Sequence, residues 1–293
     1  MNINKIVWLL IVLTILSFAI GGLILKSNIQ TYEINEEKTL SVENITRLQI
    51  ETVGADVNIM PSESGEIKAV LHGTVKTYGS NFVKLLADKK GQNIKIETKQ
   101  LPRFFPFDER EILYLDIYIP KNYEHELVLN EVSGDTKIKD MKLKSLNFTT
   151  VSGDFSGDNI SAEMKLDSVS GDLNLGKNKG RVSAETVSGK INIEYVSFEN
   201  LITAETVSGH IMLKLPKESC FDLNFDTVSG IQKTDFSLKA NDSFKNSKGQ
   251  IKGFYCNGGN TTVAGKIDVE TVSGNLGLIE INLNEPEKSG GII

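Results

Sequence analysis

The chain has 293 residues, of which 40% are hydrophobic, and its formal net charge is −6. The first 26 residues hold two lysines and no acidic residue, so the rest of the chain carries −8. This acidic balance argues against a nucleic-acid partner, because phosphate contacts need clustered lysine and arginine side chains. The length fits one elongated β domain after an N-terminal segment, or at most two subdomains that share a sheet.

The first predicted element is a transmembrane helix over residues 6–25, a run without a charged side chain. As a helix this run would span about 30 Å, the thickness of the hydrocarbon core of a bilayer. Lys5 precedes the run and acidic residues soon follow Lys26, which orients the short N-terminus toward the cytoplasm. We therefore expect residues 1–26 to be an uncleaved single-pass anchor, with the C-terminal domain outside the cytoplasm. The alternative is a cleaved signal peptide, with Ser17 and Ala19 at a small-residue cleavage site.

The segment that follows, residues 27–45, is polar and acidic, and we expect a stalk or a first edge segment. The globular part begins near Thr46. Apolar residues alternate with polar ones in four runs that predict strands, at 48–59, 67–75, 94–98 and 112–119. Between these runs, residues 81–90 are expected to form one or two helical turns, and the Pro- and Phe-rich residues 102–107 a loop.

The dominant feature of the rest of the chain is the tripeptide Val-Ser-Gly, which occurs seven times; Val53-Gly54-Ala55 is a degenerate eighth copy. Successive full copies begin 19, 18, 18, 20, 21 and 44 residues apart. A period near 20 predicts a solenoid, in which each repeat stacks on its neighbour. The valines and glycines expected at the structural corners are Val132 and Gly134, Val151 and Gly153, Val169 and Gly171, Val187 and Gly189, Val207 and Gly209, Val228 and Gly230, and Val272 and Gly274.

Each copy is flanked by two short strands. One apolar pair lies five and three positions before the Val, as in Met164 and Leu166, and a second pair lies four and six positions after it, as in Leu173 and Leu175. The two pairs have opposite phases, so a straight strand would expose one of them. We therefore expect a bend at the motif, where Gly can adopt a positive φ. Stacked bends would bury Val over Val and align the hydroxyl groups in ladders.

These patterns predict an all-β parallel β-solenoid, similar to a β-helix, because long amphipathic helical periods are missing. The alternative is an antiparallel meander with the motif as hairpin turn, although the strongest turn dipeptides are absent from the motif. We expect the repeat domain at residues 46–283, with tight repeats at 127–231, an insertion or irregular coil at 232–262, the last repeat at 266–283 and a polar tail at 284–293. Cys220 and Cys256 could pair or stay as two buried thiols.

The chain offers little that predicts chemistry. Acidic residues follow the motif in three copies, at Asp135, Asp154 and Asp172, which raises the hypotheses of a calcium site and of a carboxylate pair that cleaves glycans. Later copies lack the acid, which favours a solvated corner. The histidines His72, His125 and His210 are far apart, and seven equivalent serines do not make a nucleophile. We expect no catalytic residue, no cofactor and no metal site.

The Glu-Thr-Val-Ser-Gly runs at 185–189, 205–209 and 270–274, together with the Val-Ser-Gly-Asp runs that begin at Val132, Val151 and Val169, resemble the bacterial putative adhesin family. That family includes LiaG-like membrane-anchored proteins encoded with envelope-stress systems. The resemblance covers residues 46–283 and implies a β-solenoid-like fold and a location in the cell envelope. It supplies no catalytic or ligand-binding residue.

The sequence thus indicates a non-catalytic extracytoplasmic binding or scaffold module, anchored in the bacterial cell membrane. Its partner would be a cell-envelope polymer or a membrane protein. One alternative is an accessory regulator of an envelope-stress response, and another is a carbohydrate-active β-helix enzyme.

Overall fold

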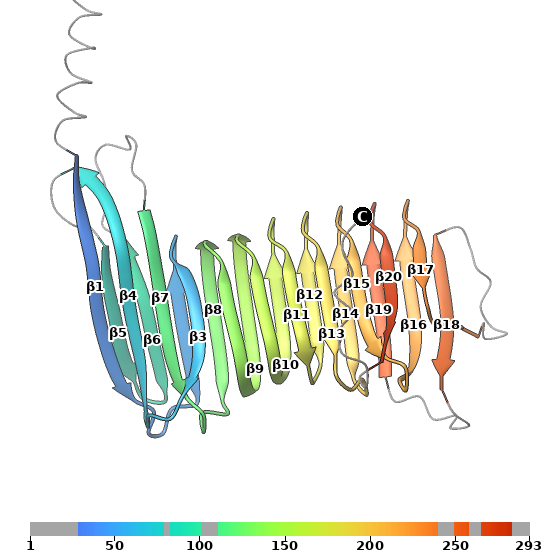
Figure 1. The fold of residues 1–293 in the computed structure, drawn as a ribbon, viewed down its shortest axis with the longest axis horizontal. Helices are drawn as coiled ribbons and strands as arrows, with labels where there is room; N and C mark the ends of the chain where they lie inside the picture. Colours follow the sequence, from blue (N-terminus) through green and yellow to red (C-terminus); the bar gives the residue numbers. More distant parts are fainter. Residues whose placement is uncertain (1–28, 79–82, 101–110, 240–248, 258–264, 283–293) are drawn as a thin grey trace, which may run out of the picture.

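The computed structural model describes residues 29–78, 83–100, 111–239, 249–257 and 265–282, and these form twenty strands and no helix. The strands lie side by side in a long two-faced stack with the apolar core between the faces (Figure 1). In spatial order, the first face consists of β5 (Val83–Lys90), β6 (Asn93–Gln100), β2 (Arg47–Thr52), β8 (Glu126–Ser133), the second parts of β9 (Thr136–Ser152) and β10 (Phe155–Ser168), β12 (Val182–Thr186), β14 (Leu201–Thr206), β19 (Gly265–Thr271), β16 (Cys220–Thr227) and β18 (Gln250–Cys256).

The second face follows the same axis. It consists of β1 (Ile29–Ser41), β4 (Glu66–Tyr78), β7 (Glu111–Pro120), β3 (Asp56–Ser62), the first parts of β9 and β10, β11 (Leu173–Asn178), β13 (Ile191–Tyr195), β15 (Ile211–Pro216), β20 (Leu276–Ile281) and β17 (Gln232–Thr234). Neighbouring repeats pair in parallel and in register, so that Met164 lies opposite Val182 and Val182 opposite Ile202. The predicted parallel solenoid is therefore confirmed, and the antiparallel meander is wrong for the repeats.

The core forms because the short strands of the tight repeats alternate between buried and more exposed positions. In β12, Val182, Ala184 and Thr186 point inward, and in β13 Ile191, Ile193 and Tyr195 do the same from the opposite face. Identical positions stack at about 4.8 Å per rung. Burial of each rung depends on its neighbours, which is why the repeats must be contiguous in space.

Spatial order departs from chain order near both ends. The last repeat, β19 and β20, lies between the rung of β14 and β15 and the rung of β16 and β17 (Figure 1). The first repeat, β2 and β3, likewise lies between the rung of β6 and β7 and the rung of β8 and β9. The 44 residues between the starts of the last two motifs therefore include β17 and β18, which lie beyond the last repeat, before the chain returns to form β19.

Antiparallel strands close both ends of the stack. At one end β1 pairs with β4 and β5 with β6, and at the other β18 pairs with β16. Much of the segment predicted as a stalk or first edge, residues 27–45, is therefore the strand β1. The segment 232–262, expected as an insertion or irregular coil, contains β17 and β18. The expected helical turns at 81–90 are wrong for the described part, which is strand β5, where the adjacent Leu85 and Leu86 hide the alternation by pointing to opposite sides.

Three of the predicted segments lie outside the described residues: the span at 6–25, the loop at 102–107 and the tail at 284–293. No helix of the described segments has the length and apolar character needed to cross a membrane.

Candidate functional site: the motif edge

The Val-Ser-Gly motifs turn the chain from the first face to the second and stack along one long side of the solenoid, here called the motif edge. The valine expected in the core is instead exposed at all eight corners, by 42% to 79%. The bend follows the Ser, so the Val keeps the outward phase of the first-face strand, whereas the preceding residue keeps the inward phase. In rung order the exposed column, here called the valine column, is Val53, Val132, Val151, Val169, Val187, Val207, Val272 and Val228.

Backbone hydrogen bonds continue through the bend. The amide of the motif Ser donates to the carbonyl of the Val in the adjacent rung, for example from Ser208 to Val187 and from Ser229 to Val272, both at 3.0 Å. Hydroxyl groups add to some corners, since Ser168 Oγ accepts a hydrogen bond from the amide of Gly171 at 2.8 Å. The predicted ladder of hydroxyl groups is not continuous, because the hydroxyl has no partner among the described residues at the equivalent positions Thr150, Thr186, Thr206, Thr227 and Thr271. The backbone hydrogen bonds between corners make the valine column a continuous strip. The strip is about 34 Å long, since seven rung spacings separate its ends.

The glycines are required by close approach rather than by positive φ in most rungs. A Cβ on Gly189 would overlap the carbonyl oxygen of Gly171, and it would lie 2.8 Å from that residue's carbonyl carbon and 2.9 Å from Thr186 Oγ1. Gly134 and Gly153, with φ of +125° and +158°, are the two corner glycines with a positive φ. The expectation of a positive φ at every corner is thus wrong, while the need for Gly is explained by the backbone of the neighbouring rung.

The three aspartates that raised the calcium and glycosidase hypotheses have a structural task. Oδ1 of Asp135 accepts a hydrogen bond from the amide of Asp154 at 3.0 Å, and Oδ1 of Asp154 from that of Asp172 at 2.8 Å. Asp172 holds the amide of Lys190 in the same way. Each carboxylate therefore satisfies a corner amide of the next rung. Among the described residues, no group of three or more potential ligands is placed to hold a metal ion.

A second row of carboxylates lies beside the valine column on the outer side of the first face. Two positions before the Val, five consecutive rungs place an acidic residue directly opposite another, here called the carboxylate row: Asp167, Glu185, Glu205, Glu270 and Asp226. Like charges directly opposite each other on neighbouring strands destabilise a sheet. Partial burial, together with the charges of Glu185 and Glu270, raises the pKa of Glu205.

The carboxylate row and the second half of the valine column line a groove of about 770 Å³. Its base includes the inward threonines Thr186, Thr206 and Thr271, and its rim includes Gln250 of β18. The sequence carries a signal for this row, because Glu-Thr-Val-Ser-Gly recurs three times. The motif alone did not lead us to predict that these glutamates lie opposite one another on the surface. Their partners in the row, Asp167 and Asp226, come from variant copies of the motif.

A larger groove of about 910 Å³ crosses the outer side of the second face. Amide groups form part of its surface: Asn58 donates to Asp116 at 2.8 Å, and Asn192 donates to Asn174 at 2.7 Å. His72 contacts Asp116 Oδ2 at 3.0 Å beside this groove. His125 contacts the ring of Tyr123, and His210 follows a corner Gly, so the structure does not bring the three histidines together.

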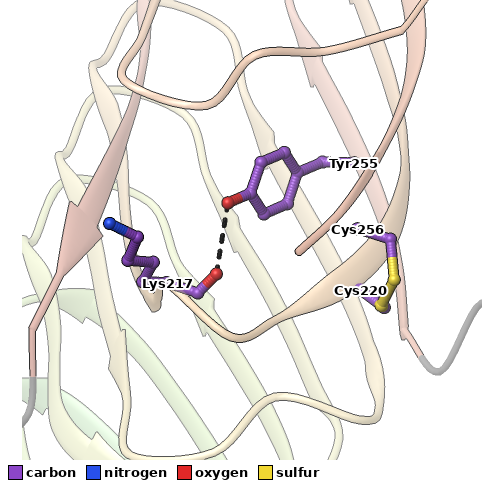
Figure 2. Close-up of a disulfide and its surroundings, with 4 residues drawn as sticks. All are labelled: Lys217, Cys220, Tyr255 and Cys256. Carbon is purple, nitrogen blue, oxygen red and sulfur yellow. Dashed lines mark hydrogen bonds between the residues drawn. A yellow bond between two sulfur atoms is a disulfide. The ribbon is translucent and has the colours of Figure 1, made fainter. Parts of the chain in front are cut away.

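Cys220 and Cys256 form a disulfide between the paired strands β16 and β18 (Figure 2). Beside it, the hydroxyl of Tyr255 donates to the carbonyl of Lys217 at 3.2 Å. The rings of Phe221, Phe236 and Tyr255 pack together, with centroids 4.7 to 5.6 Å apart. This cluster and the disulfide close the end of the core, so of the two alternatives left open by the sequence the structure has the disulfide.

Comparison with known proteins places this geometry in a family. The model described as Toastrack DUF4097 matches residues 45–279, and the chain belongs to that family. No curated protein matches the chain.

Three solved structures resemble it, each over 85% of this chain and with a TM-score of 0.38. A putative cell adhesion protein from Clostridium sporogenes is 13% identical and is covered over 100% of its length. Two putative adhesins, from Bacteroides fragilis (13% identical) and Parabacteroides distasonis (11% identical), are each covered over 97% of their length. At these values the resemblance carries no functional argument.

Proposed function

We propose that the protein is a non-catalytic binding or scaffold module, held on the outer side of a bacterial cell membrane by residues 6–25. The observation that carries this proposal is the regularity of the motif edge. Eight equivalent corners form one continuous strip, whereas catalysis needs a single constellation of a nucleophile or acid, its base and a charge-stabilising group. A strip of this kind suits contact with an extended partner such as an envelope polymer or another protein.

The geometry of the corner aspartates supports the same proposal. Glycan cleavage needs two carboxyl groups, one of which donates a proton while the other attacks or activates water. Here Oδ1 of Asp135, Asp154 and Asp172 accepts a backbone hydrogen bond from the next rung. Incubation with cell-wall glycans tests the enzyme alternative, and release of shorter glycans by the intact chain, but not by the variant with all three Asp→Asn changes, would establish catalysis.

The anchor is tested separately by fractionation of cells and mass spectrometry of the mature chain. The uncharged run is long enough to span a bilayer and extends beyond Ala19, so we expect a membrane-bound chain with an intact N-terminus that is digested by protease added outside. A soluble mature chain that begins near Ile20 would overturn the anchor. Binding is then tested by co-sedimentation of the protein with purified cell walls, with the denatured protein as control.

A further inference from the structure

The groove between the valine column and the carboxylate row is amphipathic in a way that the fold itself does not require. Val187, Val207 and Val272 are each nearly half exposed, although the corner needs only a residue whose side chain points outward. Glu185, Glu205 and Glu270 lie opposite one another in parallel register, which costs stability rather than adding to it. Both features concern the same rungs and the same side of the solenoid.

The carboxylate row has few cations of its own. Lys165 pairs with Asp167 at 2.9 Å, at one end of the row, and Lys266 pairs with Asp268, which lies outside it. Within the described ranges, no lysine, arginine or histidine forms an ion pair with Glu185, Glu205 or Glu270. The charge of Glu185 also acts on Lys165, whose pKa is raised mainly by its hydrogen bond to Asp167. At the centre of the row, Glu205 and Glu270 therefore present negative charge without an ion pair to any described residue, next to an apolar strip.

Charge decides between the possible occupants of this surface. A second copy of the chain that docked through the same groove would bring its own carboxylate row to this surface, because the row and the valines line one groove. An uncharged polymer would leave the row unpaired. A chain that carries cationic and apolar side chains side by side would neutralise the row and cover the valines at once.

We propose that this groove binds a cationic amphipathic peptide, with lysine or arginine side chains on the carboxylate row and apolar side chains on the valine column. The inference rests on the proposed binding role and names its ligand class. The row spans four rung spacings, about 19 Å, which an extended peptide covers with about six residues. The groove of about 770 Å³ is lined by all five residues of the row and by four valines of the column.

The test uses the full-length chain and a synthetic peptide of about ten residues that alternates lysine and valine, a length that covers the valine column at about 3.3 Å per residue. Titration calorimetry gives the Kd, together with two control peptides in which serine replaces valine or glutamate replaces lysine. We expect only the amphipathic cationic peptide to bind, with a Kd that rises as salt is added.

The decisive variant carries Glu185→Gln, Glu205→Gln and Glu270→Gln. Because it loses like-charge repulsion, it should fold at least as stably as the wild type while its Kd rises at least about tenfold. A matched control, Glu63→Gln with Glu124→Gln and Glu163→Gln, removes the same charge from exposed sites elsewhere and should leave the Kd unchanged. A second variant, Val187→Ser with Val207→Ser and Val272→Ser, should weaken binding to a similar degree.

Three results would overturn the inference: no binding of the amphipathic cationic peptide, equal weakening by the row and control variants, or equal affinity for the peptide without valine. Concentration-dependent dimers that the valine variant abolishes would assign the surface to a second copy instead. Failure of the peptide alongside retained binding to cell walls would remove only the ligand class. Failure of both would remove the proposed binding role.

Discussion

Glu131 gives the sharpest test of how the corners are built, because it occupies a position that is threonine or serine in every other corner. Its side chain is buried; Oε2 accepts a hydrogen bond from Thr136 Oγ1 at 2.8 Å, and Oε1 has no partner. Burial, with smaller effects from the charges of Asp56 and Asp135, raises the pKa of Glu131 from 4.5 to about 7. The carboxyl group is thus held neutral in the fold at a pH where the unfolded chain has lost the proton.

The stability that Glu131 contributes falls as the pH rises. Below pH 4.5 the group is protonated in both states, and between 4.5 and about 7 the folded state binds more protons, so the free energy of unfolding falls as the pH rises. A difference of about 2.5 in pKa corresponds to roughly 3 kcal/mol. In Glu131→Gln this loss is absent, so the stability of the variant relative to the wild type should increase by about 2–3 kcal/mol between pH 5 and pH 8.

Urea unfolding of both proteins at the two pH values measures this change, and Glu163→Gln, at an exposed site, is the control. Because Gln retains the shape of Glu and can still accept the hydrogen bond from Thr136, the comparison isolates the ionisation. Parallel pH profiles for wild type and Glu131→Gln would refute the reasoning, since they would mean that the carboxyl group ionises in the folded protein as it does in the unfolded chain.

The other predictions concern the corners and the closed end. Gly189→Val should lower the free energy of unfolding by about 1–3 kcal/mol, because the side chain would overlap Gly171. The adjacent Lys190→Ala should change it by no more than about 0.5 kcal/mol. Equal urea midpoints for the two variants would contradict the close packing of the corner glycines. Changing Asp135, Asp154 and Asp172 together to Asn should preserve the melting temperature with or without calcium, because Asn keeps the acceptor oxygen, whereas Ala at the same sites should lower it. The Cys220–Cys256 disulfide joins cysteines that are 36 residues apart in sequence, and its removal should lower the free energy of unfolding by about 3–4 kcal/mol. An unchanged free energy of unfolding after reduction would show that β18 needs no cross-link.

The repeat architecture was predictable from the sequence because its signal is periodic and redundant. The spacing of Val-Ser-Gly and the alternation of pairs such as Met164 and Leu166 specify parallel rungs without any knowledge of contacts. The side on which the Val lies was not predictable from phase alone. The Val is in phase with the buried residues of the strand that follows and with the exposed residues of the strand that precedes. It is buried if the bend comes before the Val, and it is exposed if the bend comes after the Ser.

The candidate site was less accessible to sequence reasoning for two physical reasons. The carboxylate row is contiguous only because the last repeat enters between two earlier rungs, which places Glu270 between Glu205 and Asp226. Rung order is a long-range property that periodicity does not encode. The ends of the stack were similarly hidden, since β5 and β18 are antiparallel strands without the motif, and β5 carries an apolar pair that mimics a helical pattern.

The order of the rungs is the claim on which the valine column, the carboxylate row and the groove all depend. It is tested most directly by oxidative cross-linking of two double variants, Val207→Cys with Val272→Cys and Val207→Cys with Val228→Cys. In the structure the first pair occupies adjacent rungs about 4.8 Å apart, within reach of a disulfide, and the second pair is separated by two rungs, about 9.6 Å. We predict an efficient cross-link for Val207 with Val272 and none for Val207 with Val228. The reverse result would place the repeats in simple chain order and remove the groove.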